Sequence, residues 1–188
     1  MDTVIFNFLH GLSGSFFLFN AFVLISAKYL PYLLMVMVLI FIAKIDDWKK
    51  RFLVFLTTTL ALVVSSGLLV RLIQILYVRP RPFISLDTSY LFEVGGSSFP
   101  SAHAAFLFTL VFIIFVFSKK LGWWLLALVS LNGIARVIAG VHWPLDILGG
   151  VLVALIGTGL TLLLLKRPLK SLAQESKSAE ADEDWRED

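Results

Sequence analysis

Three short polar strings interrupt an otherwise apolar sequence, and their side chains are of the types that bind and cleave phosphate groups. They are Arg79-Pro80-Arg81-Pro82, Pro100-Ser101-Ala102-His103, and Arg136 followed by His142 and Asp146. Guanidinium groups hold phosphate oxygens through paired hydrogen bonds, and imidazoles attack phosphorus or transfer protons. Each string lies at the end of an apolar run, so we expect the three to meet at one membrane face.

Composition defines the class of protein that must position these residues. Hydrophobic residues make up 59% of the 188 residues and charged residues 15%, with a mean hydropathy of +0.90. These values predict an all-α, polytopic membrane helix bundle with the bilayer as its environment. We expect one membrane domain at residues 1–168 and a disordered, acidic, cytoplasmic tail at 169–188. The net charge of +3 is modest and no DNA-binding motif is present, so we expect no nucleic-acid partner.

The apolar runs predict five membrane crossings. They cover approximately residues 29–44, 52–78, 101–118, 121–140 and 145–166. The N-terminus, without a signal-peptide pattern, predicts a short interfacial helix over 4–10. Residues 16–27 are apolar but shorter than the roughly 20 residues that a crossing requires. We interpret them as a partly inserted helix, and a single kinked span over 16–43 is the alternative.

The connectors between spans predict the orientation. Basic residues cluster in the connector 44–51, at Lys119-Lys120 and at 166–170, and alternation assigns these three segments to one side of the membrane. The positive-inside rule makes that side cytoplasmic. The three polar strings are therefore expected at the outer leaflet.

The second string has a sequence pattern typical of a helix N-terminus. We expect Ser98 to cap the helix and Pro100 to occupy its first turn. The backbone N–H groups near Ser101, Ala102 and His103 would then be free to bind phosphate, assisted by the helix dipole and the Ser101 hydroxyl. For His103 alone, an ordinary interfacial position is the simpler interpretation.

The third string places an imidazole and a carboxylate four residues apart at another helix start. A carboxylate at Asp146 that accepts one ring N–H of His142 would leave the other nitrogen free to attack. A capping interaction is the alternative for this pair. Arg136 ends the preceding span and can turn into the same pocket.

The first string supplies Arg79 and Arg81, which could clamp phosphate oxygens. For Arg79, contact with lipid headgroups is an equal alternative. Arg71 and Gln74 lie inside the same span, three residues apart. We expect Arg71 either to face a polar cavity or to snorkel toward the membrane surface, and both residues to support the groups that bind phosphate.

Tryptophans and glycines near the span ends suggest structural roles. We interpret Trp123, Trp124 and Trp143 as interfacial anchors. The pairs Gly149-Gly150 and Gly157–Gly159 are interpreted as close helix contacts.

The three strings together resemble the signature motifs of the type 2 phosphatidic acid phosphatase family. The first family motif is a lysine seven residues before Arg-Pro, and here Gln74 precedes Arg81-Pro82. The second, Pro-Ser-Gly-His, resembles residues 100–103. The third, Ser-Arg with His and Asp downstream, resembles residues 135–146, with Ala135 in place of the serine.

This resemblance implies roles for individual residues. It implies that His142 is the nucleophile, that Asp146 orients it, and that His103 protonates the leaving group and later activates water. It further implies that phosphate is bound by Arg81, Arg136, Ser101 and the backbone at Ala102, with Gln74 and Arg79 as additional candidates. No metal or other cofactor is implied. Either Arg71 or Arg79 compensates for the missing lysine and serine, or the site binds phosphate more weakly.

Within the family, the chain is most similar to the bacitracin-resistance type of undecaprenyl-diphosphate phosphatase. The implied substrate is a polyprenyl diphosphate, whose hydrolysis regenerates the lipid carrier for cell-wall synthesis. A phosphatidylglycerophosphate or phosphatidate phosphatase is the first alternative, and a non-catalytic transporter of lipid or antibiotic is the second. A vanadate-dependent halide-oxidising enzyme fits poorly because those relatives are soluble. The sequence leaves the oligomeric state and the role of Glu93 open.

Overall fold

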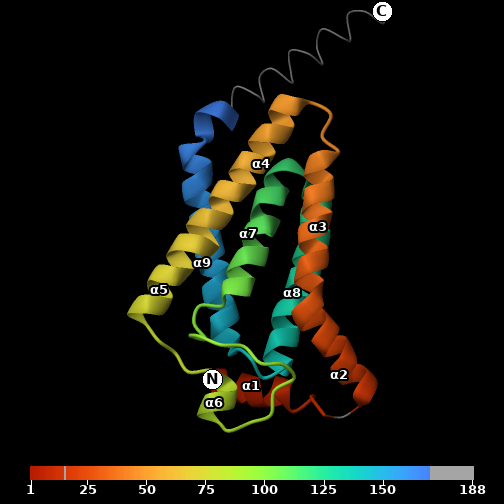
Figure 1. Cartoon of the computed structure of the whole chain (residues 1–188), viewed down its shortest axis with the longest axis vertical. Helices are drawn as coiled ribbons and strands as arrows, with labels where there is room; N and C mark the ends of the chain where they lie inside the picture. Colours follow the sequence, from red (N-terminus) through yellow and green to blue (C-terminus); the bar gives the residue numbers. More distant parts are fainter. Residues whose placement is uncertain (15, 170–188) are drawn as a thin grey trace, which may run out of the picture.

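The computed structural model describes residues 1–14 and 16–169, and within them all regular structure is helical (Figure 1). The elements are α1 Asp2–His10, α2 Phe17–Leu24, η1 Ile25–Tyr29, α3 Leu30–Ala43, α4 Trp48–Leu62, η2 Val63–Leu69, α5 Val70–Leu76, α6 Pro82–Ser85, α7 Ala102–Phe117, α8 Lys119–Ile138 and α9 Pro144–Leu164, where η marks a π-helical segment. This confirms the predicted helical membrane bundle. Nearly all of the expected acidic tail lies outside the described residues.

The first long helix is continuous from Phe17 to Ala43 and bends at η1. The structure therefore favours the single kinked span over two separate pieces. Within the π-helical turn the side-chain amide of Asn132, on α8, donates to the backbone carbonyls of Ser26 at 2.6 Å and Ala27 at 3.2 Å. A buried polar contact of this kind satisfies carbonyls that the wider turn frees from the helix.

The second long helix runs from Trp48 to Leu76 and includes its own π-helical segment, η2. Asp47 caps its start by accepting a hydrogen bond from the backbone N–H of Lys49 at 2.8 Å. The helix ends just before the first polar string, where Arg79 precedes a proline that disfavours helical geometry. Among the described residues, four helices are long and apolar enough to cross a membrane, and α7 is a shorter apolar helix.

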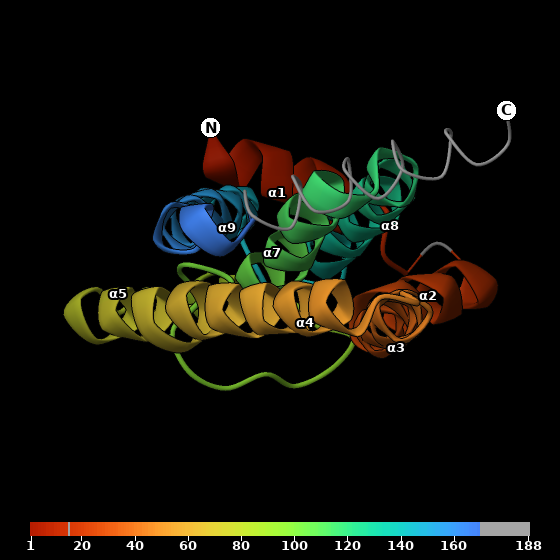
Figure 2. The same ribbon diagram turned by 90° about the horizontal axis from the view of Figure 1, so that it is seen from above.

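Helix α7 forms the centre of the bundle. Figure 2 shows it between α4 on one side and α8 with α9 on the other, and its most extensive contacts are with α9 and α8. Buried residues occur all around it, including Leu107, Val111 and Ile114. A helix that is apolar on every face is expected in this central position.

Glycines on α9 allow α7 and η2 to approach closely. A Cβ added at Gly150 would lie 2.7 Å from Cβ of Ala104 and 2.8 Å from the Ser101 carbonyl oxygen, and one at Gly157 would lie 2.6 Å from Cβ of Ser65. Gly159 has no such neighbour within 4 Å, so its predicted packing role is wrong. The close helix contacts predicted at Gly150 and Gly157 are confirmed.

Substitution at these glycines separates a packing effect from helix propensity. Gly150→Ala is expected to destabilise the bundle by about 1–3 kcal/mol, because the new methyl group meets backbone atoms at the start of α7. Gly159→Ala, in open space, should be neutral or slightly stabilising. Thermal unfolding in detergent measures both, and equal melting temperatures for the two variants would contradict the packing argument.

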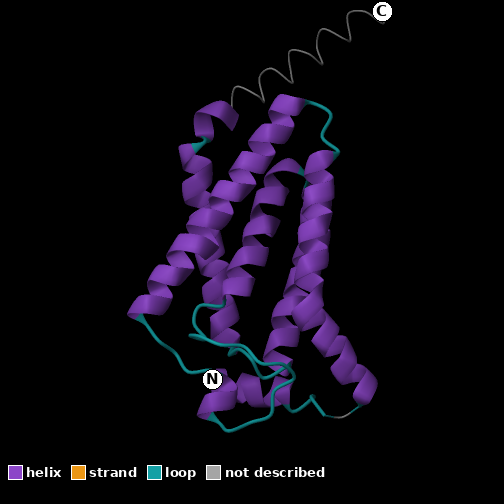
Figure 3. Ribbon diagram, in the orientation of Figure 1, coloured by secondary structure: helices purple, strands orange, loops and turns teal. Residues whose placement is uncertain are grey.

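The two ends of the bundle differ in chemistry. Figures 1 and 3 show α1, α6 and the long loop before α7 at one end, together with the α8–α9 turn. The connections α3–α4 and α7–α8 and the end of α9 lie at the other end, and these carry the basic clusters. The three polar strings therefore share one end, as the alternation of spans predicts.

Candidate active site

The turn between α8 and α9 positions the imidazole and carboxylate of the third string. Pro144 begins α9, and Asp146, three residues after the cap residue Trp143, accepts its backbone N–H at 2.8 Å. His142 lies just before this start, with its Nδ1 3.4 Å from Oδ2 of Asp146. The carboxylate therefore caps the helix and also faces the imidazole, so both interpretations of the pair hold.

The ring of His142 has two chemically different sides. Nδ1 faces Asp146 and the hydroxyl of Ser98, which is 3.5 Å away. Nε2 faces the Ser101 hydroxyl at 3.3 Å and Nη1 of Arg81 at 3.4 Å. Because the carboxylate holds a proton on Nδ1, the lone pair of Nε2 points toward the two phosphate-binding candidates.

Backbone carbonyls fix the guanidinium of Arg81. It donates to the carbonyls of Val141 at 2.8 Å, Gly95 at 2.9 Å and Gly96 at 3.2 Å. These contacts tie the loop before α7 to the residue that precedes His142. Burial lowers the pKa of Arg81, while the charge of Asp146 acts in the opposite direction.

The residue that caps the start of α7 is not the one predicted. Ser101, not Ser98, is the cap residue, and its hydroxyl accepts the N–H of Ala104 at 3.4 Å. Pro100 precedes the helix, and Ser98 instead donates to Oδ2 of Asp146. The apolar run marked the helix correctly, but which serine caps it depends on the loop geometry. Ser101 keeps its predicted place beside His142.

Arg136 is buried at the end of α8, with 1% of its surface exposed. Its Nη1 donates to the Ala27 carbonyl at 3.0 Å, and its guanidinium lies over the Phe92 ring at 5.7 Å. Its Nε and Nη2 are buried without a hydrogen-bond partner. Buried donors of this kind are costly unless a ligand satisfies them, which makes Arg136 a strong candidate for binding an anion.

Arg79 lies between two carboxylates. Nη1 contacts Asp146 at 2.8 Å and Nη2 contacts Asp2 at 2.5 Å, and the guanidinium stacks over Trp143 at 5.3 Å. Burial alone would lower the pKa of Arg79, but the hydrogen bonds and charges of the two carboxylates raise it above its ordinary value. The sequence analysis did not single out Asp2, whose signal was an acidic residue in the first turn of the N-terminal helix.

The remaining positions considered with the motifs are Gln74, Arg71 and Ala135. The side-chain amide of Gln74 donates to the Pro100 carbonyl at 3.1 Å, which anchors the approach to α7. Arg71 is exposed on the bundle surface. Ala135 packs among buried residues that include Val23 and Ala27 of the first long helix. Gln74 and Ala135 therefore contribute to the scaffold around the pocket, whereas the surface position of Arg71 gives no support to its predicted role behind the site.

Trp143 is a buried part of the site scaffold, which corrects its prediction as an interfacial anchor. Its indole N–H donates to the Pro80 carbonyl at 3.1 Å, and its ring packs against Phe6 of α1. Trp123 and Trp124 are exposed, as an anchor position requires. Position near a span end is therefore a poor guide where another helix covers the indole.

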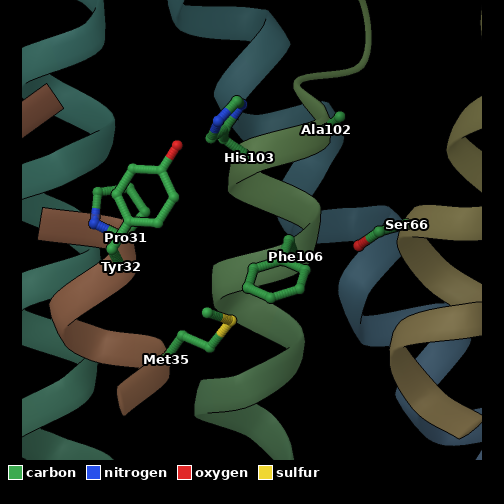
Figure 4. Close-up of a pocket in the computed structure, with 7 residues that line it drawn as sticks. All are labelled: Pro31, Tyr32, Met35, Ser66, Ala102, His103 and Phe106. Atoms are coloured by element: carbon green, nitrogen blue, oxygen red, sulfur yellow. The ribbon is translucent and has the colours of Figure 1, made fainter. Parts of the chain in front are cut away.

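His103 is exposed, whereas His142 is buried. His103 lies on the first turn of α7 and lines a groove with a volume of about 320 Å³. The other lining residues are Pro31, Tyr32, Met35, Ser66, Ala102 and Phe106. Figure 4 shows His103 and Ala102 at one end of this groove and Met35 farther along it. His103 comes two positions after Ser101, whose hydroxyl faces Nε2 of His142, so the groove begins close to the buried imidazole.

Comparison with known proteins agrees with this geometry. A model of the PAP2 superfamily matches residues 52–169, which include all three strings. The chain belongs to the PAP2 superfamily. This confirms the family resemblance, and the PAP2 chain is a multi-pass membrane phosphatase.

Several relatives of this PAP2 protein extend over most of its length. Bacitracin transport permease protein BcrC of Bacillus licheniformis is 31% identical over 153 residues, covering 80% of this chain and 74% of the relative. Undecaprenyl-diphosphatase BcrC of Bacillus subtilis (strain 168) is 27% identical over 159 residues, covering 83% and 80%. The crystal structure of Aquifex aeolicus LpxE superposes with a TM-score of 0.70 at 27% identity, covering 86% of this chain and 94% of that one.

The protonation state of His142 links this PAP2 site to stability. Burial lowers the pKa of His142 from 6.5 to about 3, the charges of Arg136 and Arg81 add to this effect, and Asp146 opposes it. The native imidazole is therefore neutral at neutral pH. The unfolded chain takes up this proton below pH 6.5, so the stabilisation is complete above pH 6.5 and is lost as the pH falls toward 3.

A pH series measures this coupling. Between pH 7.5 and 5 the wild-type protein should lose about 2 kcal/mol that His142→Gln does not lose. This corresponds to roughly 4–8 °C in melting temperature. Parallel melting curves for the two proteins across that range would contradict a neutral, buried His142.

Proposed function

We propose that this PAP2 protein hydrolyses undecaprenyl diphosphate to undecaprenyl phosphate and inorganic phosphate. The observation that carries the proposal is the His142 ring, with a carboxylate at Nδ1 and two phosphate-binding groups at Nε2. Relatives whose names include undecaprenyl-diphosphatase support the choice of a polyprenyl diphosphate.

The chemistry proceeds through a phosphohistidine on His142. Nε2 attacks the terminal phosphorus, so an N–P bond forms as the P–O bond to the lipid monophosphate breaks. Arg81, Arg136 and Ser101 bind the equatorial oxygens, and the Asp146 carboxylate stabilises the positive charge that develops on the ring. These groups are held before substrate binds, which reduces the reorganisation needed in the transition state.

His103 acts as a general acid in the first step and as a general base in the second. It donates a proton to the departing lipid phosphate, then accepts one from the water that attacks the phosphohistidine. That attack breaks the N–P bond and releases inorganic phosphate. The groove beside His103 holds the start of the polyprenyl chain, because its lining residues on α3 and α7 are predominantly apolar.

We further propose that the site faces the outside of a bacterial cell membrane. Support comes from the basic clusters at the opposite end of the bundle, including Lys49, Lys50 and the pair Lys119-Lys120. The positive-inside rule makes that end cytoplasmic. The carrier lipid would then be dephosphorylated where cell-wall synthesis releases it.

Turnover of the purified protein in detergent tests the substrate. Phosphate release from undecaprenyl diphosphate should exceed release from phosphatidylglycerophosphate or phosphatidate by at least about tenfold, since a glycerolipid presents a different leaving group and tail to the groove. Activity should persist in EDTA because the proposed chemistry uses side chains alone.

Other outcomes identify the alternatives. Equal or faster release from either glycerolipid would replace the substrate assignment by that of a glycerolipid phosphatase. Loss of activity in EDTA that added divalent cation restores would contradict a cofactor-free reaction. Lack of release from every lipid, by protein that still confers bacitracin tolerance, would support a transporter.

A further inference from the structure

Helix α1 places the carboxylate of Asp2 in contact with Arg79 and with the first turn of α9. Oδ2 of Asp2 accepts a hydrogen bond from Arg79 at 2.5 Å, and Oδ1 accepts one from the backbone N–H of Leu145 at 3.0 Å. Arg79 in turn holds Oδ1 of Asp146 at 2.8 Å. A continuous chain of contacts therefore runs from Asp2 to the carboxylate that faces His142.

Other contacts seat α1 firmly over this end of the bundle. Phe6 is fully buried against Trp143, with ring centroids 5.1 Å apart. His10 stacks on Phe6 and its Nδ1 bonds the Ile138 carbonyl at 2.9 Å. Asp2 is therefore held by packed residues along its own helix, and only 13% of its side chain is exposed.

We propose that Asp2 is a positioning residue for the phosphatase reaction, acting through Arg79 and the first turn of α9. This inference rests on the proposed roles of His142 and Asp146. The substrate does not touch Asp2, whose task is to hold the Arg79 guanidinium in place and to balance its charge.

Charge balance explains why a carboxylate is needed at this position. Arg79 contacts two carboxylates, so Asp2 offsets much of its charge and leaves Asp146 free to stabilise positive charge on His142. Without Asp2 the whole charge of Arg79 would act on Asp146. The positive ring that forms with the N–P bond would then be stabilised less, which slows the chemical step more than substrate binding.

Substitutions at Asp2 separate charge from capping. Asp2→Asn keeps an oxygen that can accept the Leu145 N–H but removes the charge. It should lower kcat on undecaprenyl diphosphate about tenfold, with KM changed less than twofold. Asp2→Glu should recover most of kcat. Thr3→Ala, an exposed neighbour on α1, should match the wild type and serves as the control.

A double-mutant cycle tests the route through Arg79. In an Arg79→Gln background, Asp2→Asn should change kcat less than twofold, because the partner through which it acts is absent. Wild-type kcat in Asp2→Asn, or fully additive effects in the double variant, would overturn the inference. The inference would also be overturned if Asp2→Asn lowered kcat and melting temperature together and Asp2→Glu did not restore kcat.

Measurements on His142→Ala keep this inference distinct from the proposed function. If His142→Ala is inactive while Asp2→Asn behaves as the wild type, only the positioning role fails. If His142→Ala retains activity, the proposed mechanism fails, and the Asp2 result then has no bearing on it.

Discussion

Replacement of His142 by alanine is expected to abolish phosphate release, with kcat lowered by at least about 10⁴-fold. The variant loses the nucleophile of the proposed mechanism, so the phosphohistidine cannot form, and the Ser101 hydroxyl that faces Nε2 is a much weaker nucleophile than an imidazole. Melting temperature at neutral pH should change much less than activity, since the ring contributes no ion pair there. Phosphate release from undecaprenyl diphosphate in detergent measures the effect.

Isotopic labelling extends this prediction to the intermediate. Wild-type protein quenched during turnover of terminally labelled substrate should carry label that is stable in alkali and labile in acid, as expected for a phosphorus–nitrogen bond. His142→Ala should carry none. His10→Ala should keep the label, because His10 donates to the Ile138 carbonyl and stacks on the Phe6 ring, both outside the contacts of His142. Label remaining in His142→Ala would refute the assignment of the nucleophile.

Asp146→Asn is expected to have the second largest effect, lowering kcat by about 10³–10⁴-fold. The carboxylate is fully buried and accepts from Arg79, Ser98 and the Trp143 backbone while facing Nδ1 of His142. An amide in its place presents one nitrogen donor where only acceptors fit. It also lets His142 take the tautomer that places the proton on Nε2, which removes the attacking lone pair.

A matched substitution at another helix cap isolates this effect. Asp47→Asn removes a capping charge from α4 at the opposite end of the bundle, where Asn caps equally well. It should leave kcat unchanged. Asp146→Asn should also lower stability, because Arg79 and Ser98 lose a charged acceptor. Near-normal turnover in Asp146→Asn would contradict an orienting role for the carboxylate.

Hydrophobic patterning was sufficient to predict most of the fold. Runs such as 52–78 and 145–166 match helices Trp48–Leu76 and Pro144–Leu164 closely, because the bilayer requires long apolar helices and little else competes. Counting the membrane crossings also predicted that the three polar strings lie at the same end of the bundle. The bend at η1 did not follow, because the carbonyl groups of Ser26 and Ala27 depend on Asn132 of another helix.

Within the candidate site, the sequence alone pointed to the residues to which the proposed mechanism assigns the chemistry. The spacing of His142 and Asp146 predicted their contact because a carboxylate in the first turn of a helix can reach back to a residue just before the helix start. Apolar runs on both sides of each string fixed where the polar groups can lie. Motif similarity supplied the roles of Arg81, Arg136 and His103, which remain proposals.

Only the tertiary structure decided which polar groups pair with one another. Asp2 and Arg79 are 77 positions apart and Ser98 and Asp146 are 48 apart, and each contact joins a loop residue to the first turn of a helix distant in sequence. Sequence periodicity records which face of a helix is buried but carries no information about polar partners across the bundle. For that reason Trp143 could be taken for an anchor and Asp2 could be overlooked, although both lie behind the same imidazole.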